Sequence, residues 1–152
     1  MRIWVDADAC PGDIKELLYR AAKRTQTRVT LVANQGLSLP RSEFIDSLLV
    51  PSGMNVADRR IVELAQPGDL VVTADIPLAA GVVAKGARAL DPRGDLYTEA
   101  NIGERLAVRN LFDELRGAGH VGGGPANFTA RDRQAFANQL DRWLTAAKKS
   151  KT

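Results

Sequence analysis

The stretch that decides the fold is Ile3-Trp4-Val5-Asp6-Ala7-Asp8-Ala9-Cys10-Pro11. A short apolar run ends in two carboxylates, and then comes a proline, which suits the first turn of a helix because it needs no amide partner there. The pattern predicts a buried strand that leads into a helix. In open α/β sheets the ligand crevice lies outside the carboxyl ends of the strands. Acids at the end of this strand therefore occupy a position where chemistry is expected.

The same arrangement recurs downstream. The run Leu70-Val71-Val72-Thr73-Ala74 leads directly into Asp75, and Pro77 follows two positions later. Two strands that each end in an aspartate predict a shared carboxylate site, and hard cations such as Mg²⁺ or Mn²⁺ prefer oxygen ligands. The leading interpretation is a metal-dependent enzyme that acts on phosphate esters.

Strand-like and helix-like segments alternate along the chain. The predicted strands cover residues 3–5, 28–33, 44–50, 69–74 and 87–90, and the predicted helices cover 11–23, 56–65, 77–85, 101–116 and a last segment that starts with the capping box at 129–132. This alternation predicts a three-layer α/β fold with a mostly parallel sheet of about five strands and two C-terminal helices. Residues 1–148 are expected to form one domain, and residues 149–152 a frayed basic tail.

Composition narrows the class of protein. The chain has 152 residues with 45% hydrophobic and 26% charged content, which is enough for one domain with a real core. Neither a signal peptide nor an apolar run of the roughly 20 residues needed to span a bilayer is evident. A single cysteine rules out an internal disulfide and fits a reducing compartment. We therefore expect a cytoplasmic protein that does not bind membranes.

The net charge of +3 is unevenly distributed. Residues 1–97 hold 12 basic and 12 acidic side chains, whereas residues 98–152 hold 9 basic and 6 acidic ones, so the excess lies in the C-terminal third. Part of it is the lysine-rich end of the chain, which either attracts polyanions or is simply a solvated terminus. Because exposed charges are largely screened at physiological salt, the second interpretation is favoured.

Each of these aspartates has a structural role as the alternative to a functional one, and the weight of that alternative differs among them. An Asp after a strand often caps the next helix, but Asp6 lies too far ahead of Pro11 for that, which favours a functional role. Asp75 is either a cap or a site residue. Asp8 is either a second ligand or a loop acid that binds local amides. Asp58 stands at a helix start, where negative charge is favourable anyway, so its spacing alone carries little weight. Asp69 starts its strand and is expected to be structural.

Two segments carry a resemblance. Asn55-Val-Ala-Asp58-Arg-Arg-Ile-Val-Glu-Leu-Ala65 and Gly68-Asp-Leu-Val-Val-Thr-Ala-Asp75 resemble the core of the PIN-like and NYN ribonuclease superfamily. The resemblance implies Asp6, Asp58 and Asp75 as the acids that hold Mg²⁺ or Mn²⁺, with Thr73 as the hydroxyl of a Thr-x-Asp motif that contacts substrate. PIN nucleases often have a fourth acid after this motif, and Ile76-Pro-Leu-Ala-Ala supplies none; Asp8 could substitute.

A narrower family is similar over essentially the whole chain. Val5-Asp-Ala-Asp-Ala-Cys-Pro11, the two segments above, Asn101-Ile102 and the run from Gly124 to Asp141 resemble the bacterial YaiI/YqxD family. Together the resemblances imply a metal-dependent ribonuclease whose catalytic acids are Asp6, Asp8, Asp58 and Asp75. Phosphodiester hydrolysis requires basic groups that receive the RNA backbone. The candidates are Arg59, Arg60, Arg105 and Arg109, and ordinary surface arginines are the alternative for all four.

Two other functions stay open. A haloacid dehalogenase-like phosphatase would use Asp6 as nucleophile and Asp8 as acid, although Ala9 and the lone Asp75 fit that class poorly. A non-catalytic RNA-binding or regulatory module could keep the PIN-like fold without turnover. A cysteine hydrolase is disfavoured because Cys10 has no evident His partner, so a buried small side chain is expected there. The Gly122–Pro125 run lacks the lysine of a P-loop and is expected to be a flexible connector or lid.

Overall fold

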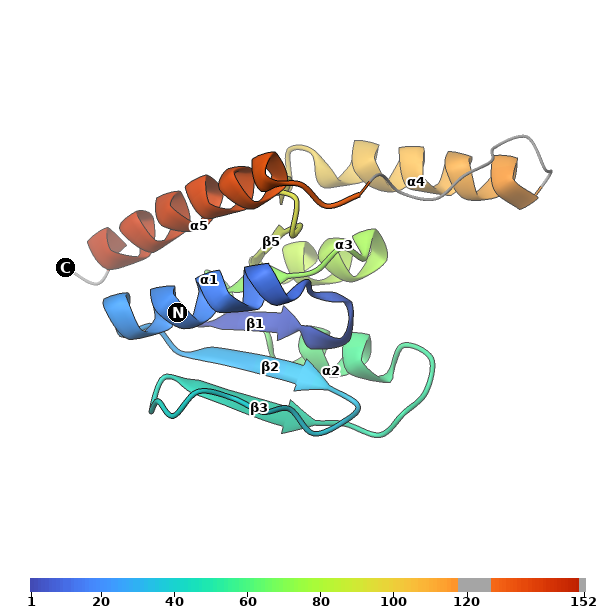
Figure 1. Ribbon diagram of the computed structural model, residues 1–152. Helices are drawn as coiled ribbons and strands as arrows, with labels where there is room; N and C mark the ends of the chain where they lie inside the picture. Colours follow the sequence, from blue (N-terminus) through green and yellow to red (C-terminus); the bar gives the residue numbers. More distant parts are fainter. Residues whose placement is uncertain (118–126, 151–152) are drawn as a thin grey trace.

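The computed structural model describes residues 1–117 and 127–150 (Figure 1). Its strands are β1 (Ile3–Asp6), β2 (Val29–Ala33), β3 (Ile45–Leu49), β4 (Leu70–Val72), β5 (Arg88–Leu90) and β6 (Leu96–Tyr97). Its α-helices are α1 (Gly12–Thr25), α2 (Val56–Leu64), α3 (Ile76–Ala84), α4 (Ile102–Gly117) and α5 (Ala130–Ser150), and a short 3₁₀ helix, η1 (Ala7–Ala9), follows β1. The expected alternation of strands and helices is confirmed. The Gly122–Pro125 run lies outside the described residues.

The six strands form one sheet in the order β3-β2-β1-β4-β5-β6. The first five are parallel and β6 is antiparallel to β5, so the mostly parallel α/β sheet is confirmed. Six strands agree with the expected sheet of about five, and the additional one is β6, which has only two residues and therefore no period to detect. Val5 pairs with Leu31 on one side and with Val72 on the other, which places β1 centrally.

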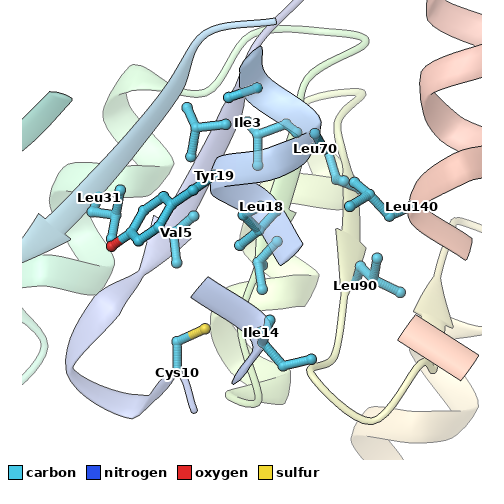
Figure 2. Close-up of a cluster of buried hydrophobic side chains, with 14 of the residues drawn as sticks. Ile3, Val5, Cys10, Ile14, Leu18, Tyr19, Leu31, Leu70, Leu90 and Leu140 are labelled. Atoms are coloured by element: carbon cyan, nitrogen blue, oxygen red, sulfur yellow. The ribbon is translucent and has the colours of Figure 1, made fainter. Parts of the chain in front are cut away.

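Helices cover both faces of the sheet (Figure 1). On one face, Ile3 and Val5 of β1 pack with α1 and α5, and Figure 2 shows Ile14, Leu18 and Leu140 of these helices among them. On the other face, the alternate residue Trp4 packs with side chains of α2 and α3. This is the period-2 alternation of a strand that is buried on both sides. Trp4 and Trp143 are core residues, as expected.

Buried Asp69 ties the amino end of β4 to β1. It accepts hydrogen bonds from Trp4 Nε1 (3.0 Å) and from the backbone N–H groups of Arg2 (3.1 Å) and Gln66 (2.9 Å). These charge-assisted bonds replace the solvation that the buried carboxylate loses. Its expected structural role is confirmed.

The two C-terminal helices differ from expectation in the burial of α4 and in the length of α5. α4 carries no buried residue, and Val108, Leu111 and Phe112 are exposed on it. α5 continues to Ser150, two residues into the segment 149–152 that was expected to be frayed, because Ala146-Ala147-Lys148-Lys149 are good helix formers. Within the described part of the chain, no helix is both long and apolar enough to cross a membrane.

Candidate active site

A buried hydroxyl joins the carboxyl ends of β1 and β4. Thr73 follows β4, and its Oγ1 donates a hydrogen bond of 3.0 Å to Asp6 Oδ2, while it accepts one of 3.0 Å from the backbone N–H of Asp75. Thr73 is 1% exposed and Asp6 is 9% exposed. The two aspartates that each follow a central strand are therefore linked through one side chain, as parallel neighbouring strands predict.

Asp75 also caps α3. Its Oδ1 accepts a hydrogen bond of 2.9 Å from the backbone N–H of Leu78, and Pro77 lies in the first turn of the helix. This is the N-cap arrangement that satisfies an otherwise unpaired amide. The capping alternative for Asp75 is thus realised, and it fixes the carboxylate beside the site rather than removing it. Asp6, in contrast, does not cap α1, as expected, because the N-cap position of that helix is Pro11. Its side chain makes no capping hydrogen bond to the intervening 3₁₀ helix either.

The carboxylates repel each other. Burial, followed by the negative charges of Asp75 and Asp6, raises the pKa of Asp58 to about 6, and a hydrogen bond to Asp75 favours its protonated form. Burial also raises the pKa of Asp6, and the charges of Asp75 and Asp8 act in the same direction, while the Thr73 hydrogen bond opposes them. Like charges that share a site disfavour ionisation in this way. The negative charges of the three acids are therefore not balanced by positive groups in the part of the protein that the structure describes.

The donor set fits a hard divalent cation. Carboxylate oxygens of Asp6, Asp58 and Asp75 are the ligands that Mg²⁺ and Mn²⁺ prefer, and in the described part of the chain none of these acids forms an ion pair. Across residues 1–117 and 127–150, however, no three His, Cys, Asp or Glu side chains already converge on one point as metal ligands. Rotation of carboxylate side chains would be needed to gather them around one ion.

A groove of about 720 Å³ opens beside Asp58 and Asp75. The other residues that line it come from the loop before α2, from α2, from the start of α3 and from α4: Met54, Asn55, Arg59, Val62, Glu63, Pro77, Leu78 and Arg109. The groove brings Arg59 and Arg109 to the acids, although they are far apart in sequence. Arg109 also pairs with Asp113 at 2.9 Å on its own helix.

The other two arginines lie elsewhere. Arg60 pairs with Glu63 at 3.1 Å and lines a neighbouring cavity of about 380 Å³, which Arg59 shares. Arg105 is exposed on α4 and is not among the groove residues. Because successive residues of a helix point in different directions, only one of the adjacent Arg59 and Arg60 can face the groove.

Thr73, Asp8 and Cys10 differ in how well they meet expectation. Buried Thr73 has no surface for substrate, so its geometry is that of a positioning residue, not the expected substrate contact.

Asp8 is exposed, and its Oδ2 accepts a hydrogen bond of 3.2 Å from the backbone N–H of Asn34, which is the loop-acid alternative. Cys10 is buried as expected, and burial raises the pKa of its thiol to about 12, which opposes a nucleophilic thiolate.

Several groove residues were not site candidates in the sequence analysis, and two of them are notable. Met54 is 87% exposed, the highest value among the large apolar side chains that the structure describes. Asn55 precedes α2 in the left-handed conformation (φ 63°), and its side chain makes no capping hydrogen bond. The run Ser52-Gly53-Met54-Asn55 reads as a turn, and only the tertiary position of the loop brings it beside Asp58.

Comparisons with known proteins place this sequence among bacterial relatives. The model of the family described as uncharacterised, YaiI/YqxD, matches residues 4–146. A "UPF0178 protein" of Cronobacter sakazakii is 59% identical over 149 residues, covering 98% of this chain and 99% of the relative. Another from Burkholderia ambifaria is 62% identical over 144 residues, covering 95% and 96%. No solved structure matches. The chain therefore belongs to the YaiI/YqxD family.

Proposed function

We propose that this protein is a metal-dependent ribonuclease that hydrolyses RNA phosphodiesters at Asp6, Asp58 and Asp75. The observation that carries the proposal is a set of mutually repelling carboxylates. Asp6 and Asp75 at the ends of β1 and β4 are linked through Thr73, and Asp75 and Asp58 of α2 line a groove that also holds two arginines. Acids held together at a cost in electrostatic repulsion call for a functional reason, since a purely structural cluster would not be favoured.

The resemblance to PIN-like nucleases supports the choice of reaction. In those nucleases one acid follows the first strand, one lies on a middle helix and one ends the Thr-x-Asp motif. The corresponding positions in this chain are Asp6, Asp58 and Asp75. The mostly parallel sheet with helices on both faces agrees with that superfamily, but a fold hosts many functions. The site chemistry, not the fold, is therefore the stronger support.

The protein's own groups divide the work as follows. Asp58 and Asp75, which line the groove, would hold Mg²⁺ or Mn²⁺, and Asp6, oriented by Thr73 at the end of β1, would be the third ligand. The bound cation supplies charge neutralisation at the phosphoryl oxygens and activation of water. Arg59 and Arg109, which line the same groove as Asp58 and Asp75, bind the RNA backbone. Asp8 holds the loop after β2 through Asn34 and adds negative charge near Asp6.

Cleavage of RNA tests the proposal directly. End-labelled single-stranded and structured RNAs are incubated with the wild type and with Asp6→Asn, in Mn²⁺, in Mg²⁺ and in chelator. Cleavage is expected only for the wild type and only with metal. Glu43→Gln is the matched control, because it removes an exposed carboxylate outside the site and should cleave like the wild type.

The other interpretations give different results in the same assay. RNA that is bound but never cleaved in either metal would contradict the nuclease and favour a non-catalytic RNA-binding module. Hydrolysis of p-nitrophenyl phosphate that depends on Asp6 and Asp8, without RNA cleavage, would favour the phosphatase. The burial of Asp6 and its bond to Thr73 disfavour that nucleophilic role.

A further inference from the structure

A second hollow lies at the opposite end of the strands from the acids. It measures about 860 Å³ and lies between the C-terminal ends of α1 and α5, which run side by side at the left of Figure 1. Thr27 in its wall precedes β2, whereas Asp6 ends β1. The hollow therefore belongs to the amino ends of the strands and is separate from the groove with Asp58 and Asp75. We call it the basic crevice.

The walls of the basic crevice carry a surplus of positive charge. Lys23 and Arg24 come from the last turn of α1 and Lys148 from the last turn of α5, and Asp141 is the single acid among the lining residues that the structure describes. Arg142 and Lys149 stand beside it on α5 and line an adjoining hollow. Five basic side chains against one acid leave a net charge of +4 in this small area.

Helix stability alone does not account for this surplus. Basic side chains near a helix C-terminus offset the negative end of the helix dipole, which is about half an elementary charge. Two helix ends together therefore balance about one positive charge. Most of the charge of the crevice remains, in a protein whose whole formal charge is only +3.

The ion pairs among the described residues do not neutralise the two crevice lysines, Lys23 and Lys148. Arg24 and Asp141 pair with each other at 3.2 Å, so together they contribute no net charge. Lys23 and Lys148 take part in none of the ion pairs among the residues that the structure describes. Both lysines are exposed and line the crevice, so a polyanion bound there would lie beside their charges.

The lining also holds an unusual polar residue. Gln26 ends α1 in the left-handed conformation (φ 55°), a position where glycine is the common choice. Gln26 and Asn55 are the non-glycine residues with positive φ in the described part of the chain, and each lines one of the two hollows. At Gln26 a side-chain amide is kept beside the lysines, where it can donate to a phosphate oxygen.

We infer that the basic crevice binds the phosphate backbone of RNA, away from the carboxylate groove. Lys23 and Lys148 provide the main charge contacts and Gln26 a polar one. The choice of RNA as the polyanion rests on the proposed function, but the binding needs no catalysis. Phosphates are held here by positive charge, while the metal-free carboxylate edge repels them. A chain anchored at the crevice keeps RNA near a groove that alone would attract it weakly.

Binding is measured by fluorescence anisotropy of a labelled 20-nucleotide single-stranded RNA, in chelator to prevent cleavage, at salt concentrations from 50 to 300 mM. The wild type is compared with the double variant Lys23→Glu/Lys148→Glu and with the milder Lys23→Gln/Lys148→Gln. Arg41→Glu is the matched control, because it reverses an exposed charge outside both hollows. Circular dichroism verifies that each variant is folded.

Loss of two phosphate contacts from a single strand makes the slope of log K against log salt less steep by about 1.4. For affinities that are equal at 1 M salt, this is about a 25-fold weaker affinity at 0.1 M salt. We expect at least this loss for the Gln pair, more for the Glu pair, and wild-type binding for Arg41→Glu. Equal losses in Arg41→Glu, or wild-type affinity and slope in both lysine pairs, would overturn the inference. The inference would also be overturned if the wild type did not bind RNA but bound vesicles of anionic lipid through these lysines.

The two proposals fail separately. RNA binding that depends on the lysines, without cleavage in Mn²⁺, refutes the nuclease and keeps the crevice. Cleavage that depends on Asp6 but is indifferent to Lys23 and Lys148, with unchanged binding, keeps the nuclease and refutes the crevice.

Discussion

Thr73 Oγ1 and Asp6 Oδ2 are joined by a hydrogen bond of 3.0 Å across 67 positions of sequence. The bond connects the ends of two central strands, and the same hydroxyl oxygen accepts the N–H of Asp75. A single buried side chain therefore sets the orientation of one acid and the backbone of another. This makes Thr73 the residue through which the fold controls the geometry of the site.

Removal of that hydroxyl should destabilise the protein and disturb Asp6. Thr73→Val keeps the shape but leaves the buried Asp6 oxygen and the Asp75 amide without their partner, a loss of about 1–3 kcal/mol. Because the hydrogen bond lowers the pKa of Asp6, that pKa should rise further in the variant. Urea unfolding measures the first effect and carboxyl NMR titration the second. Thr73→Ser, which keeps the hydroxyl, should lie closer to the wild type; equal stability of Val and wild type would contradict the assignment.

Asp58 should make stability depend on pH in the metal-free protein. Its pKa is about 6 in the folded state, above its value of about 3.9 in an unfolded chain. Between these values the native state binds more protons, so the stability due to protonated Asp58 is complete below pH ~4 and is lost as the pH rises through about 6. Ionised Asp58 is thus destabilising at pH 7.

Asp58→Asn should therefore be more stable than the wild type at pH 7 by on the order of 1 kcal/mol, after allowance for solvent screening of this half-buried group. The difference should vanish near pH 4. Urea unfolding in chelator at both pH values measures it, with Glu43→Gln as the control for loss of an exposed acid. A variant that is less stable than the wild type at pH 7 would show that the Asp58 charge is favourable, against the electrostatic account.

The sequence was sufficient for the arrangement of the main elements and for the strand-end acids. The apolar runs before Asp6 and Asp75 are buried on both sides, and such continuous runs are the signature of central parallel strands. The two-residue strand β6 could not be predicted, because it depends on pairing with β5 and not on its own pattern. α4 was predicted from its apolar period, yet that period did not reveal that no residue of the helix is fully buried and that Val108, Leu111 and Phe112 are exposed.

The roles of individual residues in the site could be assigned only from the tertiary structure. Arg59 and Arg60 are equivalent in sequence, and only the rotation of α2 directs the first into the groove and the second to Glu63. Thr73 was identified as part of a motif, but its burial, which changes its role from substrate contact to positioning, is a tertiary property. Asp8 had two open alternatives; the structure shows the loop contact, a hydrogen bond from the Asn34 N–H, while the ligand role stays a prediction.

Asp75 allows metal binding and capping to be separated. Asn caps a helix about as well as Asp, whereas Ala does not, so Asp75→Asn should keep its stability and Asp75→Ala should lose about 1 kcal/mol. Both variants lack the anionic oxygen and should bind Mn²⁺ more weakly than the wild type. Urea unfolding and titration calorimetry give the two readouts. If Asp75→Asn bound Mn²⁺ with full wild-type affinity and unchanged stability, Asp75 would not be a metal ligand.

Gly94 should be the least replaceable of the glycines in the described residues. It lies in the turn between β5 and β6 with φ 99°, and a Cβ there would lie 2.5 Å from Ala135 Cβ and 2.8 Å from the Ala135 carbonyl carbon of α5. Gly94→Ala combines a left-handed backbone with a clash against a helix, and we expect a loss of about 2–4 kcal/mol. Gly12→Ala is the matched control, because nothing lies within 4 Å of its added Cβ and it starts α1 without positive φ.

The measurement for this pair is urea unfolding, and RNA binding adds a second readout. Since Ala135 and Lys148 belong to the same helix, a shift of α5 that relieves the clash at Gly94 also moves a wall of the basic crevice. Gly94→Ala should therefore weaken RNA binding under conditions where it is still folded, and Gly12→Ala should not. Stability equal to the wild type in Gly94→Ala would mean that α5 does not pack against this turn in solution.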